Sequence, residues 1–217
     1  MTEVQGRRIE STPEEVAYEL RAAEGSIWTG TRLLVGVATF AYASLAFAYF
    51  YLRSSNNEDL WRPGGITAPT EIGAAIAALI AASAVLVAFG LRRLRAGQTT
   101  DWLIAGWLVV LGALIGIGLQ IYELTRLPFS PGSSGYASCF VGWASLNIGA
   151  MFAATYWLET VLARAIRLRK NIDPAERSAG GATPSALLFR ANVESCAYFW
   201  GYLGLVSVLF WVLFYIV

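Results

Sequence analysis

Residues 102–122 read WLIAGWLVVLGALIGIGLQIY, and this stretch contains no charged side chain. An α-helix rises about 1.5 Å per residue, so about 20 apolar residues span the hydrocarbon core of a bilayer, which is about 30 Å thick. The stretch therefore predicts a helix that crosses a membrane.

Four other charge-free stretches of similar length flank this one. They are residues 33–52, 72–91, 136–158 and 195–217. The segment LPFSPGSSGY (127–136) is rich in proline, glycine and serine, which predicts a turn outside the bilayer between the third and fourth spans. Of the 217 residues, 56% are hydrophobic and 14% charged, and the mean hydropathy is +0.53, beyond that of ordinary soluble domains. We expect an all-α fold, a polytopic transmembrane bundle of five helices.

Positive charges lie mostly on one side of these spans. Thirteen of the sixteen Lys and Arg residues fall in the N-terminal tail, the loop after the second span and the loop after the fourth. The other three are Arg53, Arg62 and Arg126. Because cytoplasmic loops accumulate Lys and Arg, we expect a multi-pass protein of the bacterial inner membrane with a cytoplasmic N-terminus and a periplasmic C-terminus.

The parts expected outside the membrane are small. Residues 1–30 read as a cytoplasmic tail, followed by a transmembrane domain over 31–217. Within the tail, Thr12, Pro13 and Glu15 form a capping box with proline at the first helical position, which predicts a short amphipathic helix over 11–25. Residues 164–192 are expected to form a cytoplasmic loop.

Several classes of function are excluded by composition. The chain has no histidine, so it cannot hold a histidine-ligated haem, copper or zinc centre. The net charge of +1 gives no reason to expect a nucleic-acid partner. Cys139 and Cys196 are too few for a metal site and are expected to be buried free thiols. No hydrolase motif or acidic cluster is present, so we expect no catalytic centre in this chain.

Small residues recur at spacings that allow helices to pack closely. Gly112 and Gly116 form a G-x-x-x-G pair, and Gly142 and Gly149 lie on one face of the fourth span. In lipid, helices associate where small residues let their backbones approach, so these faces are expected to meet helices of this chain or of another subunit. The fifth span carries aromatic side chains on several sides and is expected to face lipid or to fill a groove on a partner.

Ionisable groups at membrane depth are candidate functional residues, because burying an uncompensated charge is expensive. Gln120 and Glu123 are three residues apart and share one face of the third span. Glu194, close to Arg190, is expected to open the fifth helix and to complement its dipole. Arg53, Arg190 and Glu194 are candidates for contacts with lipid headgroups or a partner at the membrane interface. Glu159 is expected to pair with a nearby arginine such as Arg164.

Five stretches, in order along the chain, resemble subunit III of haem-copper terminal oxidases (the cytochrome c oxidase family) in its short five-helix form. They are FAYFYLRSS (47–55), WRPGGITAP (61–69), LQIYELTRLPF (119–129), GYASCF (135–140) and VESCAYFW (193–200). The family's motif positions fall on Trp61, Gln120, Glu123 and Trp200. Where the family has histidines, this chain has Asn147, Ala150 and Gly201, and the family's buried glutamate is replaced near Phe40.

The resemblance implies a role without catalysis. Subunit III binds no metal; haem and copper belong to its partner, subunit I, which reduces oxygen using cytochrome c or quinol. The resemblance therefore implies a chain that docks on subunit I and contacts other oxidase subunits. It also implies bound phospholipid and support for proton pumping by the complex.

Two other functions remain open on the sequence. An accessory protein of nitric oxide reductase shares the subunit III fold. A small membrane transporter or channel would need polar lining residues, and the spans offer only Gln120, Asn147 and scattered Ser and Thr. A membrane-embedded lipid enzyme would need a reactive constellation that the sequence does not contain.

Overall fold

The computed structural model describes residues 12–56, 60–171 and 184–217, with side chains in the fourth long helix described up to residue 168. The described residues form helices joined by short connections and contain no strand. The elements are α1 (Pro13–Ser54), η1 (Pro63–Gly65), α2 (Thr70–Arg95), α3 (Thr99–Thr125), α4 (Gly135–Asn171), α6 (Pro184–Trp211) and η2 (Val212–Ile216), the last a π-helical turn.

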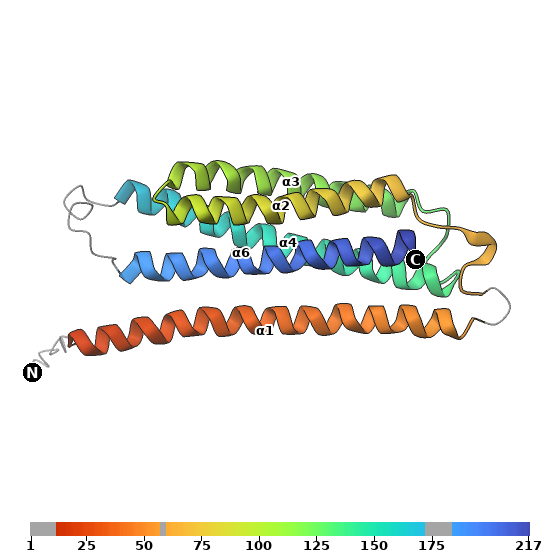
Figure 1. Cartoon of the computed structure of the whole chain (residues 1–217), viewed down its shortest axis with the longest axis horizontal. Coiled ribbons are helices and arrows are strands. Elements are labelled where there is room, and N and C mark those ends of the chain that lie inside the picture. Colours follow the sequence, from red (N-terminus) through yellow and green to blue (C-terminus); the bar gives the residue numbers. More distant parts are fainter. Residues whose placement is uncertain (1–11, 57–59, 172–183) are drawn as a thin grey trace, which may run out of the picture.

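Four of the helices form a closed bundle and the fifth lies beside it. α2 packs on α3 and α6, and α4 packs on α3 and α6, whereas α1 contacts only α4 and α6 extensively (Figure 1). Only 11% of the apolar window of α1 is buried within the chain, against 33–44% for the other long helices. α1 is therefore the helix most open to lipid or to a partner.

Five helices in the described part of the chain are long and apolar enough to cross a bilayer, which is the fold of a multi-pass membrane protein. An odd number of crossings leaves the N- and C-termini at opposite ends of the bundle, here named the N-terminal end and the C-terminal end (Figure 1). The turn predicted over 127–136 is confirmed for residues 127–134, since α3 ends at Thr125, but residues 135 and 136 already belong to α4.

The N-terminal helix differs from the prediction. The capping box is confirmed: the backbone N–H of Glu15 donates to Oγ1 of Thr12 (3.3 Å), and the Thr12 N–H donates to Oε2 of Glu15 (2.8 Å). The helix that starts there, however, runs unbroken for 42 residues to Ser54, so no separate short helix exists over 11–25. Single glycines at 25 and 30 disfavour helix too weakly to stop one.

The loop predicted over 164–192 is also shorter than expected. α4 continues to Asn171 and α6 begins at Pro184, while residues 172–183 lie outside the described part of the chain.

At about 1.5 Å per residue, the 42-residue α1 is about 63 Å long, roughly twice the hydrocarbon thickness. α1, α4 and α6 therefore extend past the shorter helices at the N-terminal end (Figure 1).

Four of the eight aromatic residues of the fifth span lie in the core, and for these four the prediction that the span faces lipid or a groove on a partner is wrong. They are Phe199, Trp200 and Phe210 of α6 and Phe214 of η2, whereas Tyr198 is exposed. Their bulk fills the space between α6 and the three helices around it, because α6 is the one helix that contacts α1, α2 and α4. Both cysteines are buried free thiols, as predicted.

Candidate functional site

A chain of buried polar side chains crosses the bundle near its C-terminal end. Asn147 of α4 donates through Nδ2 to Oε1 of Gln120 (2.9 Å), and Gln120 of α3 donates through Nε2 to Oε2 of Glu123 (2.8 Å). The hydroxyl of Tyr215, in η2, donates to Oε1 of Glu123 (2.5 Å). Four side chains from three elements thus form one hydrogen-bonded network.

The network is buried, which raises the free-energy cost of breaking its hydrogen bonds. Gln120 and Glu123 are 0% exposed and Asn147 is 1% exposed. Among the described residues, Glu123 has no ion pair, so its carboxyl group depends on the amide of Gln120 and the phenol of Tyr215. In a low-dielectric interior, each such hydrogen bond is expensive to lose because the partner is left unpaired.

Sequence reasoning found Gln120 and Glu123 but not Tyr215. The tyrosine lies in an apolar aromatic segment and has no local signal that marks it as a partner of a residue 92 positions away. Gly73 of α2 makes the contact possible, since a Cβ built at Gly73 would lie 2.2 Å from Cζ of Tyr215. The absence of a side chain at Gly73 therefore leaves room for the tyrosine ring.

A second buried cluster joins the loop after α1 to the start of α4. The Trp61 ring, 7% exposed, meets the rings of Tyr49 (4.9 Å between centroids) and Tyr136 (6.0 Å) edge to face. The Tyr136 hydroxyl donates to the Phe214 carbonyl (3.0 Å) and accepts from the Ala68 N–H (3.2 Å). Trp61 thus belongs to an aromatic anchor that ties the loop, α4 and η2 together.

Trp200 lies elsewhere, in the core of the four-helix bundle. It is 0% exposed and belongs to the same buried cluster as Ile80 of α2 and Leu203 of α6. Its indole N–H has no hydrogen-bond partner among the described residues. The family-motif residues are therefore all buried, but they occupy separate places and do not form a single site.

The four glycines predicted for helix packing divide into two groups. A Cβ at Gly112 would lie 3.3 Å from Oγ of Ser83, and one at Gly116 would lie 3.1 Å from Cε of Met151. A Cβ at Gly142 would lie 3.3 Å from Cδ2 of Leu45, but one at Gly149 would meet nothing within 4 Å. Gly149 therefore makes no close helix contact within the described part of this chain.

Glu194 does not open a helix as expected, because α6 begins ten residues earlier at Pro184. Its Oε1 instead accepts from Nη2 of Arg95 (2.9 Å) and from Nε of Arg190 (3.1 Å), which ties the end of α2 to α6. Arg53 lies over the ring of Tyr49, 6.0 Å from its centroid. Glu159 has no ion pair among the described residues, so the expected pairing is not found.

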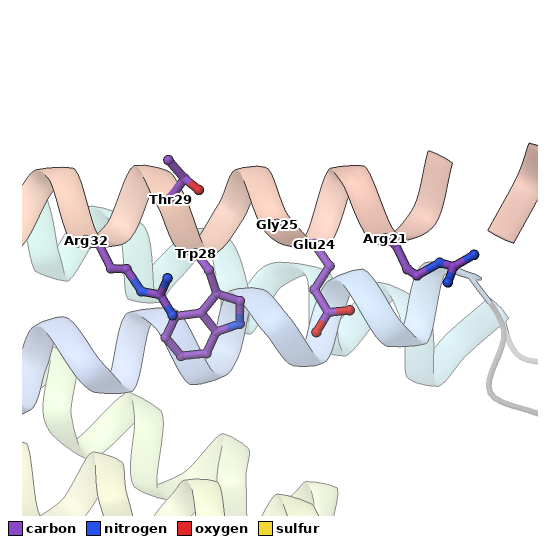
Figure 2. Close-up of a pocket in the computed structure, with 6 residues that line it drawn as sticks. All are labelled: Arg21, Glu24, Gly25, Trp28, Thr29 and Arg32. Carbon is purple, nitrogen blue, oxygen red and sulfur yellow. The ribbon is translucent and has the colours of Figure 1, made fainter. Parts of the chain in front are cut away.

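A shallow pocket of about 430 Å³ lies along the N-terminal part of α1 and is lined entirely by that helix. In Figure 2, Trp28 and Arg32 reach from α1 toward α6, whereas Thr29 points away from it. The Trp28 ring meets the ring of Tyr198 of α6 edge to face (6.4 Å between centroids). Tryptophan beside arginine is typical of a helix passing through the membrane interface.

The candidate site consists of hydrogen-bonded polar side chains in the interior of the bundle. Within the described ranges, no three His, Cys, Asp or Glu side chains are grouped so that they could hold a metal ion. No family model matches the chain, and no curated protein matches it.

Proposed function

We propose that this chain is an accessory subunit of a respiratory haem-copper terminal oxidase, of the subunit III type. It docks on subunit I, holds structural phospholipids and supports oxygen reduction and proton pumping without a catalytic centre of its own. Haem and copper belong to subunit I. The chain lies in the bacterial inner membrane, and the excess of Lys and Arg at the N-terminal end supports a cytoplasmic location for that end.

The observation that carries the proposal is the ordered set of five family-like stretches between residues 47 and 200. The motif residues of these stretches, Trp61, Gln120, Glu123 and Trp200, are buried. Gln120 and Glu123 anchor the polar network. Gly135 leaves room for Trp61, since a Cβ at Gly135 would lie 2.9 Å from Cε3 of that ring. Side chains with this degree of burial are constrained in size, because the interior of a protein is closely packed.

Purification of the tagged full-length chain from its own membranes in mild detergent tests the proposal. We expect a haem-containing partner to co-purify, and we expect the assembly to consume oxygen. A monodisperse preparation with no haem-containing partner would contradict it. An assembly that reduces nitric oxide instead of oxygen would assign the chain to nitric oxide reductase. Solute flux into liposomes containing the chain alone, abolished by Asn147→Leu, would favour a transporter.

A further inference from the structure

A cavity of about 320 Å³ lies at the C-terminal end of the bundle, between the loop that carries η1 and the loop that joins α3 to α4. The two loops lie side by side at that end (Figure 1). The second loop connects the charge-free stretches 102–122 and 136–158, so the cavity lies at the membrane surface, within reach of ligands from water. At about 30 Å³ for each water molecule, its volume equals about ten waters, which suits a small organic ligand.

One part of the lining is apolar. Pro63 and Ile66 come from the first loop, and Pro128 and Phe129 come from the second. The Phe129 ring meets the ring of Tyr136 edge to face, 5.7 Å between centroids. Tyr136 belongs to the buried aromatic anchor, so the anchor holds the Phe129 ring in place. This wall can therefore take the apolar body of a ligand without first being ordered.

The charged part of the lining is Arg62. Its guanidinium group lies over the ring of Tyr136, 4.5 Å from the centroid, which covers one face of the group. Nε of Arg62 is buried and has no hydrogen-bond partner among the described residues, and Arg62 has no ion pair among them. None of the described residues that line the cavity is acidic. The cavity therefore has one uncompensated positive charge, with Nη1 and Nη2 as the donors that can reach a ligand.

Three serine hydroxyls lie on the same lining, those of Ser130, Ser133 and Ser134. Oγ of Ser134 accepts from the N–H of Ala137 (3.1 Å), so its O–H can still donate to a ligand. α4 begins directly after Ser134 and has no acidic side chain in its first turn, so the positive end of its dipole lies beside the cavity. The guanidinium group, the hydroxyls and the helix dipole all favour an anion.

We propose that this cavity binds a small organic acid through its carboxylate group. The carboxylate accepts from the terminal nitrogens of Arg62 and from the serine hydroxyls, and the apolar body of the acid lies against Ile66 and Phe129. A single guanidinium group balances a single negative charge and matches the planar shape of a carboxylate. The apolar wall favours an acid with a ring or a short alkyl chain over an inorganic ion.

The test uses the full-length chain with whatever subunits co-purify, in mild detergent, and measures binding of para-fluorobenzoate by fluorine NMR. The neutral para-fluorobenzamide has the same ring and reports partition into the detergent. We expect saturable binding of the benzoate and none of the amide. Acetate lacks the ring and should compete only at concentrations at least about tenfold higher. Absence of saturable benzoate binding would overturn the proposal, and so would inorganic phosphate that competes as well as unlabelled benzoate.

Arg62→Gln tests the charged part of the lining. Hydrogen bonds to a charged group are strong, so this variant should weaken benzoate binding at least about tenfold. The matched control is Arg126→Gln, because Arg126 lies over the ring of Tyr122 at the same end of the bundle (5.2 Å) but does not line the cavity. The control should bind as the wild type does. An equal loss in both variants would show a general effect of charge and would overturn the proposal.

A second variant leaves Arg62 and its contact with Tyr136 intact. Ser130 and Ser133 are exposed, so Ser130→Ala/Ser133→Ala should keep the wild-type unfolding temperature and weaken benzoate binding several-fold. Unchanged binding in this variant would overturn the proposal. The binding assay does not depend on the identity of the co-purifying subunits, so its outcome is separate from that of the proposed function.

Discussion

The hydroxyl of Tyr215 donates a 2.5 Å hydrogen bond to the carboxyl group of Glu123, and so joins the C-terminal π-helical turn to the middle of the polar network. Glu123 is fully buried and accepts its other hydrogen bond from Gln120. The contact thus ties η2 to α3 through two residues that are 92 positions apart in the sequence.

Removing the hydroxyl should destabilise the protein. Tyr215→Phe leaves one oxygen of the buried Glu123 carboxyl group without its donor, which is expected to lower the free energy of unfolding by about 1–3 kcal/mol. The measurement is thermal unfolding in detergent. Tyr156→Phe is the matched control because Tyr156 is 71% exposed, and its effect should stay within about 0.5 kcal/mol. Equal effects of the two variants would show that the Tyr215 contact contributes nothing.

The identity of residue 123 should matter through hydrogen bonding. In Glu123→Gln, the amide oxygen can accept from Gln120 while the amide nitrogen donates to the Tyr215 oxygen. In Glu123→Leu, the amide nitrogen of Gln120 and the hydroxyl of Tyr215 both lose their acceptor. We expect the Leu variant to be less stable than the Gln variant by at least about 1 kcal/mol in the same unfolding assay. If the Leu variant is as stable as the Gln variant, the network is not a source of stability.

Gly73 should not tolerate a side chain. Alanine there would place a methyl group against the Tyr215 ring, and such overpacking typically costs about 1–3 kcal/mol. Gly118→Ala, where a Cβ meets nothing within 4 Å, is the control and should be neutral or stabilising by up to about 1 kcal/mol. Unfolding temperatures of the two variants compare them directly, and a stable Gly73→Ala protein would show that the ring can move away.

The carboxyl group of Glu194 should contribute a salt-sensitive link between α2 and α6. Its side chain is 19% exposed and meets two arginines, whereas the Arg93–Asp101 pair is about 40% exposed on both sides. Glu194→Gln is expected to cost about 1 kcal/mol at low salt and less at high salt, and Asp101→Asn less than about 0.5 kcal/mol. Chemical denaturation at two ionic strengths measures both, and a loss independent of salt would contradict the electrostatic origin.

Cysteine labelling can test the proposed orientation, in which the N-terminal end of the bundle faces the cytoplasm. The native thiols are buried, so the wild-type chain should react with a membrane-impermeant maleimide only after unfolding. Ser55→Cys and Ala96→Cys introduce thiols at opposite ends of the bundle. In intact cells we expect labelling at residue 55 and none at residue 96 until the membrane is permeabilised. The reverse pattern would invert the orientation.

Much of the fold could be predicted because its signals are local. A charge-free stretch such as 102–122 is long enough to span a bilayer whatever it packs against, and the capping box at Thr12 uses atoms only three residues apart. The two prolines and the glycine at 128, 131 and 132 lie close together and interrupt a helix through local steric effects. These features required no knowledge of which helices are neighbours.

Where the helices end and which of their faces are buried could be learned only from the tertiary structure. Nothing local stops α1 at residue 25, and the helix runs on to Ser54. The aromatic residues of α6 are equally apolar whether they face lipid or protein, so their burial depends on α6 lying among α1, α2 and α4. In a membrane, hydrophobicity does not distinguish the inside of a bundle from its outside, because lipid is as apolar as the core.

The sequence by itself therefore determined an all-helical membrane chain with five spans, two buried thiols and a polar pair at Gln120 and Glu123. Only the tertiary structure decided that Asn147 and Tyr215 complete that pair and that Arg62 lines a cavity shared with Phe129. The physical reason is range: helix formation and bilayer crossing depend on neighbours within a few turns. A hydrogen bond across 92 residues depends on how whole helices pack.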